Sequence, residues 1–261
     1  MSDSVRLFSI DSGQYAQFRP TYPASLFTWL AEKTPRHTLA LDVAAGSGQA
    51  TLGLVPRFDT VLACDASVTQ LQEASGWATA KRFAANAERL PLTSGTVDLL
   101  VVAQALHWFA TPVFFAEARR VLTADGLFCA WCYGLLRLTP RIDAIIDHLH
   151  GTTLRGYWPD GRASVDAGYR DIRPSVPFPL IEPPAFFIEA HWRLDQLLGY
   201  LRTWSAVRQW QQIHGEDPIE AIATSLQHLW GNPERELDVR WPLHFITGYP
   251  GAQETPCPTN C

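Results

Sequence analysis

The segment LALDVAAGSGQAT, residues 39–51, places a carboxylate and two glycines at the end of an apolar run. Such a run is typical of a buried strand that enters a loop of small residues and then opens a helix. Gly46 and Gly48 carry no side chain, so a ligand can approach the backbone closely. Asp42 stands just before this loop and gives it a negative charge. The loop therefore predicts a small-ligand site, and Asp42 limits what that ligand can be.

The charge of Asp42 separates two cofactors that bind to loops of this kind. A dinucleotide would bring its pyrophosphate to the turn, where a carboxylate repels it and offsets the positive helix N-terminus. S-adenosylmethionine instead carries an ammonium and a sulfonium, which a carboxylate attracts. The third glycine of the dinucleotide fingerprint is also missing, because Thr51 occupies its place. The residues favour S-adenosylmethionine, with a nicotinamide-dependent oxidoreductase as an alternative.

A second carboxylate, Asp65, ends the next apolar run, VLACD. A carboxylate at this place can accept both hydroxyls of a ribose in two charge-assisted hydrogen bonds. The structural alternative is a helix cap, but Ser67 can take that role. We expect Asp65 to bind ribose, which either cofactor would supply.

Short apolar runs alternate with helical stretches from about residue 38 to 134, which predicts βαβ units around a parallel sheet. We expect strands in TLALDVA, TVLACD, KRFAA, TVDLLVVAQ and GLFCAWCY. Before the last strand, Thr111 can cap a helix that begins at Pro112, and Asp125 with Gly126 turns the chain into the strand. The predicted fold class is α/β, with a doubly wound and mostly parallel sheet.

The segments on either side of residues 38–134 predict a cover for this sheet. Residues 1–37 hold the proline-containing stretch YAQFRPTYP and a first helix, and we expect an N-terminal lid there. Residues 135–249 hold amphipathic helices in DAIIDHLH and LDQLLGYLRTWSAVRQWQQI. The same region has strands in AFFIEAHWR and VRWPLHFITG, which bring the sheet to seven strands. We expect a capping insertion here and a disordered tail over residues 250–261.

Composition and charge argue against several classes of partner. The formal charge is −5, and Lys and Arg are scattered, so no basic stripe is available for nucleic acid. No stretch approaches the roughly 18 apolar residues of a membrane helix, and the N-terminus does not resemble a signal peptide. We expect a cytoplasmic protein that binds neither nucleic acid nor membrane. Its oligomeric state is open.

No residues have the spacing of metal ligands. Cys129 and Cys132 form a CxxC, but residues three apart on a strand face opposite sides. His191, His214 and His244 do not follow a metal-binding pattern either. We expect no metal.

Five segments resemble, in order and spacing, the class I S-adenosylmethionine-dependent methyltransferases. They are LDVAAGSG, CDAS, ANAERLP, DLLVVAQALHW and RVLTADG, and they cover about residues 39–130. The resemblance implies an enzyme with a Rossmann-like sheet, an N-terminal lid and a helical insertion after the fifth strand. It also implies S-adenosylmethionine as the cofactor and S-adenosylhomocysteine as the product.

The resemblance also implies which residues bind this cofactor. Residues of the first loop would hold the methionine part and Asp65 the ribose. Residues after the second and third strands would surround the adenine, and those after the fourth would lie beneath the methionyl chain. The full set is Tyr15, Arg19, Asp42, Ala44, Gly46, Ser47, Asp65, Ala66, Gln70, Asn86, Ala87, Glu88, Gln104 and Ala105. Ala44 departs from the usual glycine and Asn86 from a frequent aspartate, but neither change disables the site, because alanine is small and asparagine can both donate and accept.

More narrowly, YAQFRPTYP, the pair His107-Trp108, WSAVRQW and VRWPL resemble the trans-aconitate and cantharidin-detoxifying type of small-molecule methyltransferase. This resemblance implies that Tyr15 and Arg19 close over the cofactor. We expect a small acceptor with a carboxylate or hydroxyl oxygen. His107 is the candidate catalytic base for a hydroxyl, whereas a carboxylate needs no base. The alternatives are a structural His107 and a non-catalytic subunit that binds S-adenosylmethionine.

The acceptor pocket is expected to draw on the lid and the insertion. Residues of the right kind are Tyr157, Trp158, Pro159, Tyr169, Trp204 and Arg208. On one continuous helix, Leu201, Trp204 and Arg208 would share a face, and core packing explains Leu201 and Trp204 equally well.

Overall fold

The computed structural model describes residues 21–73 and 79–251, which form two compact units. The core unit is built from described residues in 22–133, 164–186 and 243–251, and the helical unit from residue 21, 134–163 and 187–242. Tyr15, Arg19 and residues 252–261 of the predicted tail lie outside the described residues. The tail was predicted to begin at residue 250, but Pro250 is buried and its carbonyl accepts a hydrogen bond from Arg119 Nε at 2.6 Å.

The seven strands follow the order β3-β2-β1-β4-β5-β7-β6. Their bounds are β1 (Leu39–Val43), β2 (Thr60–Asp65), β3 (Lys81–Ala84), β4 (Val97–Ala103), β5 (Leu122–Tyr133), β6 (Phe187–Trp192) and β7 (Leu237–Gly248). Strands β1 to β5 run parallel, and β7 runs antiparallel to both β5 and β6. Residues 243–248 of β7 pair with β5 in the core unit, and residues 237–242 pair with β6 in the helical unit. The mostly parallel, seven-stranded sheet predicted from the sequence is confirmed.

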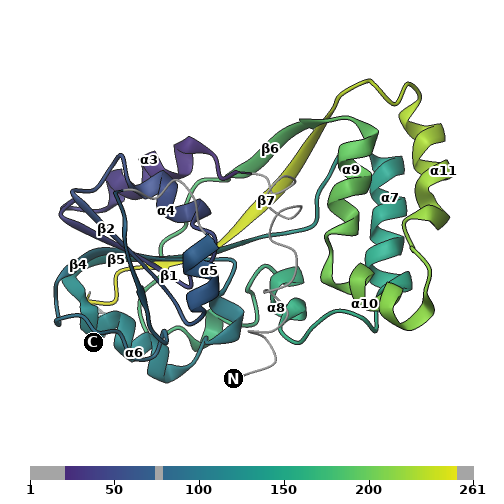
Figure 1. The fold of residues 1–261 in the computed structure, drawn as a ribbon. Coiled ribbons are helices and arrows are strands. Elements are labelled where there is room, and N and C mark those ends of the chain that lie inside the picture. Colours follow the sequence, from purple (N-terminus) through teal and green to yellow (C-terminus); the bar gives the residue numbers. More distant parts are fainter. Residues whose placement is uncertain (1–20, 74–78, 252–261) are drawn as a thin grey trace, which may run out of the picture. The chain divides into compact units, whose positions relative to one another are not determined.

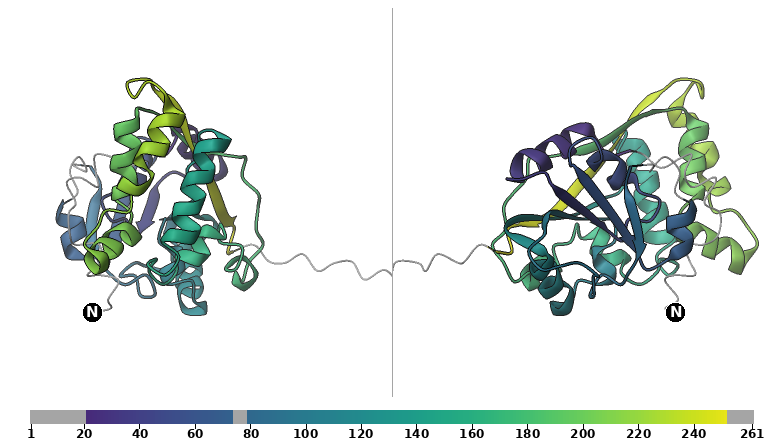
Figure 2. Two further views of the ribbon diagram at one scale, coloured as in Figure 1. Left: turned by 90° about the vertical axis from the view of Figure 1, so that its right-hand side faces the viewer. Right: turned by 60° about the vertical axis from the view of Figure 1, so that its left-hand side comes forward.

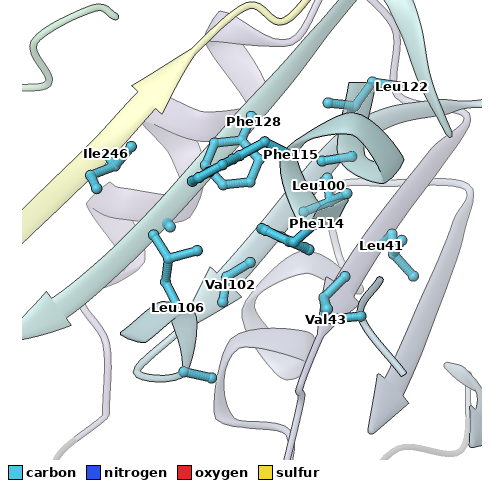
Figure 3. Close-up of a cluster of buried hydrophobic side chains, with 14 of the residues drawn as sticks. Leu41, Val43, Leu100, Val102, Leu106, Phe114, Phe115, Leu122, Phe128 and Ile246 are labelled. Atoms are coloured by element: carbon cyan, nitrogen blue, oxygen red, sulfur yellow. The ribbon is translucent and has the colours of Figure 1, made fainter. Parts of the chain in front are cut away.

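Helices cover both faces of the core-unit sheet, as Figure 1 shows for α3 and α4 on one side and α6 on the other. The helices of this unit are α3 (Ala24–Lys33), α4 (Gln49–Leu54), α5 (Val68–Glu73) and α6 (Pro112–Val121). On the first face Phe27 of α3 packs edge-on against Trp131, with ring centroids 6.5 Å apart. On the second face Phe114 and Phe115 of α6 lie against Phe128 (Figure 3). Burial on both faces explains why the strands are continuous apolar runs.

The start of α6 follows its prediction, but the turn after it does not. Thr111 caps the helix by accepting a hydrogen bond from the backbone N–H of Phe114 at 3.2 Å. The predicted turn at Asp125 and Gly126 is wrong, because β5 already begins at Leu122. These residues instead lie in an irregular stretch of β5, where the pairing with β4 shifts register.

A buried carboxylate ties together the starts of β1 and β4. Asp98 of β4 accepts hydrogen bonds from the backbone N–H groups of Thr38 and Leu39, each at 3.0 Å. Its second oxygen accepts one from Arg36 Nε at 3.2 Å. The amino edge of the sheet is therefore closed by satisfied polar groups, and a ligand site is expected at the carboxyl edge.

The helical unit contains α7 (Pro140–His148), which continues as a π-helical turn (Leu149–Thr153), together with α9 (Leu194–Arg202), α10 (Ser205–His214) and α11 (Glu220–Trp230). Helix α11 contacts both α7 and α9, and the four helices gather in one group (Figures 1 and 2). The short helix α8 (Arg162–Asp166) contains the boundary between the two units, which falls between residues 163 and 164.

The predicted single helix over residues 194–213 is wrong. The chain breaks between α9 and α10, where the Thr203 hydroxyl donates to the Tyr200 carbonyl at 2.6 Å and Trp204 has an extended backbone with ψ 132°. A threonine that bonds to the preceding turn competes with helix continuation. Leu201 and Trp204 therefore do not share the face of one helix.

The described cysteines are buried thiols. Cys129 lies 3.2 Å from the Thr247 hydroxyl and Cys132 lies 3.9 Å from the Val165 carbonyl, so the CxxC does not form a sulfur pair. Burial raises the pKa of Cys64 and of Cys129 to about 12. Within residues 21–73 and 79–251, no three His, Cys, Asp or Glu side chains are grouped as metal ligands. None of the described helices is both long and apolar enough to cross a membrane.

Candidate functional site

Asp42 lies inside the core unit on β1, with no exposed surface. Its Oδ2 accepts a hydrogen bond from the Thr51 hydroxyl of α4 at 2.6 Å. Its Oδ1 is buried and has no hydrogen-bond partner among the described residues. Burial raises the pKa of Asp42 to about 7, and the hydrogen bonds from Thr51 oppose this only in part. A buried oxygen without a partner is costly, so Oδ1 offers an acceptor that a bound ligand could satisfy.

The loop between β1 and α4 turns through left-handed backbone conformations. Ala44 has φ 56°, Gly46 φ 53° and Gly48 φ 83°. The Ala45 N–H donates to the Cys64 carbonyl at 2.9 Å, which joins the loop to the end of β2. A left-handed conformation costs a glycine little, whereas alanine pays for its Cβ. The family's usual glycine at position 44 is thus explained by the backbone.

This conformation predicts that Ala44→Gly raises the free energy of unfolding, by up to about 1 kcal/mol, because glycine removes the strain of the Cβ. The matched control is Ala223→Gly in α11, where φ is helical and glycine should cost about 0.5–1 kcal/mol. Urea denaturation of both variants measures the difference. An equal loss in both would contradict the left-handed conformation of Ala44.

Asp65 at the end of β2 organises the same loop. Its Oδ2 accepts from the Gly46 N–H at 3.0 Å and its Oδ1 from the Ser67 N–H at 2.8 Å. Ser67 caps α5, because its hydroxyl accepts from the Gln70 N–H at 3.4 Å. Each carboxylate oxygen of Asp65 has one further lone pair, which matches the two hydroxyls of a ribose. A Cβ placed on Gly46 would lie 3.8 Å from Gln70 Oε1, so the structure brings these predicted residues together.

The residues predicted at the adenine edge follow β3. Asn86 is exposed, Ala87 is buried and Glu88 is half-buried. The end of this loop is held by α6, because Glu117 accepts from the Leu90 N–H at 2.6 Å. The hydrogen bond from Arg120 lowers the pKa of Glu117, which keeps this anchor ionised. Ala66, on the other side of the expected adenine, is exposed after β2.

Gln104 and Ala105 leave the carboxyl end of β4. Gln104 has φ 61°, a strained value for a non-glycine residue, and its N–H donates to the Trp131 carbonyl at 2.8 Å. Its side-chain Nε2 is buried and lacks an acceptor within the described part of the chain. Neighbouring strands β1 and β4 thus each supply one unsatisfied group, an acceptor on Asp42 and a donor on Gln104. An amino acid carries the complementary pair, an ammonium and a carboxylate.

His107 lies in a short 3₁₀ helix (Leu106–Trp108) after Gln104, and its Nδ1 is 3.2 Å from the hydroxyl of Tyr169. Tyr169, which was expected to line the acceptor pocket, is fully buried and contacts His107. Burial raises the pKa of Tyr169 well above its usual value, so the phenol is neutral. The ring of Trp108 lies beside that of His107, tilted by 43° with centroids 4.7 Å apart, and Trp108 is exposed.

The other residues expected at the acceptor pocket belong to the helical unit. The ring of Trp158 lies 5.4 Å from that of Trp204, and Trp204 and Leu201 are buried. Arg162 lies over Trp158 at 4.4 Å. These contacts pack Trp158 and Trp204 against each other within that unit, and their place at an acceptor pocket stays a prediction.

Two contacts of this site were not anticipated from the sequence. Thr51 was noted only as the residue that replaces a third glycine, whereas its hydroxyl binds Asp42. A hydroxyl in the first turn of the helix that follows the loop was the available signal. No sequence signal joins Tyr169 to His107, because the two residues are far apart in the chain.

Comparison with known proteins finds related chains over nearly the full length. A model of the methyltransferase domain matches residues 41–130. A Dictyostelium discoideum protein named as a methyltransferase is 31% identical over 246 residues, which cover 92% of this chain and 93% of that protein. A solved structure named as a type II methyltransferase, from Anaeromyxobacter dehalogenans, is 42% identical with a TM-score of 0.84, covering 89% of this chain and 98% of the other. The malonyl-[acyl-carrier protein] O-methyltransferase of Geobacter sulfurreducens is 38% identical over 106 residues, which are 36% of this chain and 38% of that protein.

Proposed function

Because the chain belongs to the class I S-adenosylmethionine-dependent methyltransferases, we propose that it methylates a carboxylate or hydroxyl oxygen of a small molecule. The observation that carries the assignment of the site is the pair of unsatisfied buried groups, Asp42 Oδ1 and Gln104 Nε2, at the ends of neighbouring strands. An oxygen acceptor is favoured by the relative whose name specifies O-methylation of a malonyl group. The acidic chain, with a formal charge of −5, favours a small molecule over nucleic acid.

Each part of the cofactor has a counterpart among the described residues. Asp42 would accept from the methionine ammonium, and Gln104 would donate to the carboxylate. Asp65 would accept the two ribose hydroxyls while it keeps the Gly46 loop in place. The adenine would lie between the exposed Ala66 and the loop that holds Asn86. Gly46 leaves room for the backbone to approach the ligand, because among the described residues a Cβ there would meet only Gln70 within 4 Å.

Bound S-adenosylmethionine supplies an electrophilic methyl group on a positively charged sulfur. The residues of the chain then have to align an acceptor oxygen with that methyl group and exclude water. We assign the alignment of the acceptor and the exclusion of water to the segment after β4, where Trp108 and Phe109 provide aromatic surface beside His107. A dry aromatic environment favours a reaction in which an anion and a cation neutralise each other.

We assign the chain to the trans-aconitate and cantharidin-detoxifying type, with Tyr15 and Arg19 closing over the cofactor. The support is the sequence pattern alone, since both residues lie outside the described part. The predicted cytoplasmic location belongs to the same proposal.

Calorimetric titration with S-adenosylmethionine, S-adenosylhomocysteine and NAD tests the proposal directly. We expect the first two to bind and NAD not to bind. Labelled methyl donor is then offered with a panel of small carboxylic acids, phenols and alcohols. Binding without transfer to any of them would favour the non-catalytic subunit, and binding of NAD alone would overturn the assignment of the site.

A further inference from the structure

His107 and Tyr169 join two distant segments of the core unit. His107 follows β4 by one short turn, and Tyr169 follows α8. Their side chains meet at His107 Nδ1 and the Tyr169 hydroxyl oxygen, 3.2 Å apart. The direction of this hydrogen bond decides which ring nitrogen of His107 carries a proton.

The backbone of Tyr169 is held firmly in position. The N–H of Gly168 donates to the Val165 carbonyl at 2.9 Å and that of Tyr169 to the Ser164 carbonyl at 2.8 Å, a pair of bonds that ends a helix in a Schellman motif. Gly168 has φ 61°, and a Cβ there would lie 2.7 Å from the ring of His244. Tyr169 also has φ 61°, a conformation that a bulky residue keeps only when its surroundings impose it.

The Tyr169 hydroxyl has His107 Nδ1 as a hydrogen-bond partner, 3.2 Å away. Tyr169 has no exposed surface, and burial keeps its pKa well above the usual value, so the hydroxyl retains its hydrogen. The backbone N–H groups of His107 and Leu106 face the phenol oxygen and oppose part of this rise in pKa. A buried tyrosine hydroxyl normally donates to a partner, and His107 Nδ1 is the acceptor at hand. A neutral imidazole whose Nδ1 accepts carries its proton on Nε2.

We infer that Tyr169 is a positioning residue that holds His107 with its proton on Nε2, so that His107 donates a hydrogen bond to a carboxylate acceptor and does not deprotonate a hydroxyl. The inference rests on the proposed function and narrows its acceptor class. A carboxylate oxygen forms a bond to the methyl carbon while the carbon–sulfur bond breaks, and that electron pair remains on sulfur. No proton has to move, so a donor at Nε2 orients the anion without a base being required.

Nuclear magnetic resonance tests the tautomer without any acceptor. Long-range ¹H–¹⁵N spectra of the histidine-labelled chain at about pH 8, above the ordinary histidine pKa, report which ring nitrogen is protonated. The His107 signals are those that disappear in His107→Gln. We expect an unprotonated Nδ1 in the native chain, and signals that move toward an average of the two tautomers in Tyr169→Phe. A protonated Nδ1 in the native chain would overturn the inference, even if Tyr169→Phe does not fold.

The kinetic test compares two substitutions at His107. Glutamine places an amide N–H near the position of Nε2 but has no basic nitrogen, whereas alanine supplies neither. We expect His107→Gln to methylate the best carboxylic acid of the panel within about tenfold of the native rate, and His107→Ala to lose about ten- to a hundredfold, as for a hydrogen bond to an anion. If His107 acts as a base, both variants should lose about 10²- to 10⁴-fold in methylation rate, and that result would overturn the inference. Failure of the proposed function is distinct, because the native chain would then bind no S-adenosylmethionine or methylate nothing.

Discussion

Replacing Asp65 with alanine is expected to weaken S-adenosylmethionine binding by about a hundredfold or more. The carboxylate would accept two ribose hydroxyls, and a hydrogen bond to a charged group contributes about 1.5–3 kcal/mol. The substitution also removes the acceptor for the Gly46 N–H, which shapes the loop under the methionine part. Calorimetry with S-adenosylmethionine and S-adenosylhomocysteine measures the change, which should be similar for both ligands because they share the ribose.

Asp59→Ala is the matched control for Asp65→Ala. Asp59 is exposed and immediately precedes β2, whereas Asp65 ends the same strand. This control should leave both affinities unchanged. A thermal melt of each variant without ligand separates lost binding from lost folding. If Asp65→Ala folds and binds as tightly as the native chain, the ribose assignment is wrong.

Asp42→Asn is expected to remove a pH dependence of stability that the cofactor-free native chain shows. The carboxyl of Asp42 holds its proton up to about pH 7 in the folded chain, against an ordinary pKa of 3.8. Between these values the folded state binds the additional proton, so the free energy of unfolding falls as pH rises. The stabilisation that comes from the proton on Asp42 is fully present below about pH 4 and is lost by about pH 7. Above about pH 7 this group adds no further change to the free energy of unfolding. The pKa difference corresponds to about 4 kcal/mol.

Urea denaturation across pH 4 to 9 measures this effect as the difference between the native chain and Asp42→Asn, in which other titrations cancel. Asparagine does not ionise, so the difference should shrink or reverse in favour of the variant as pH rises. The exposed Asp59→Asn serves as the control and should follow the native curve. Parallel curves for the native chain and Asp42→Asn would show that Asp42 titrates normally and is not buried as described.

The strands and the cofactor loop could be predicted because local signals agree there. Apolar runs such as that of β4, buried on both faces, leave little choice of structure, and Thr111 with Pro112 marks a helix start without ambiguity. The approach of Asp65 to Gly46 follows from the topology, since parallel strands place their carboxyl ends at one edge. The irregular stretch of β5 was missed because Asp125 and Gly126 are equally typical of a turn.

In the helical unit, the periodicity of apolar residues did not suffice to predict where the helices begin and end. The apolar spacing continues across Thr203 and Trp204, yet a side-chain hydrogen bond ends α9 there. Helix α11 was not predicted, since its buried stripe is narrow and comprises Leu226 and Trp230. Tyr169 could not be placed either, because its strained backbone and its contact with His107 depend on segments distant in sequence.

The buried cysteine thiols of the central sheet allow the opening of its strands to be measured. Cys64 lies on β2, and Cys129 and Cys132 lie on β5, where water and alkylating agents do not reach them. A thiol with a pKa of about 12, as for Cys64 and Cys129, supplies almost no reactive thiolate near neutral pH. Once Cys257 and Cys261 are replaced by serine, each alkylated molecule is one whose strands have separated. Mass spectrometry of the alkylated thiols then gives the opening rate of individual strands. The factor by which S-adenosylmethionine slows this alkylation measures how strongly the ligand stabilises the closed sheet.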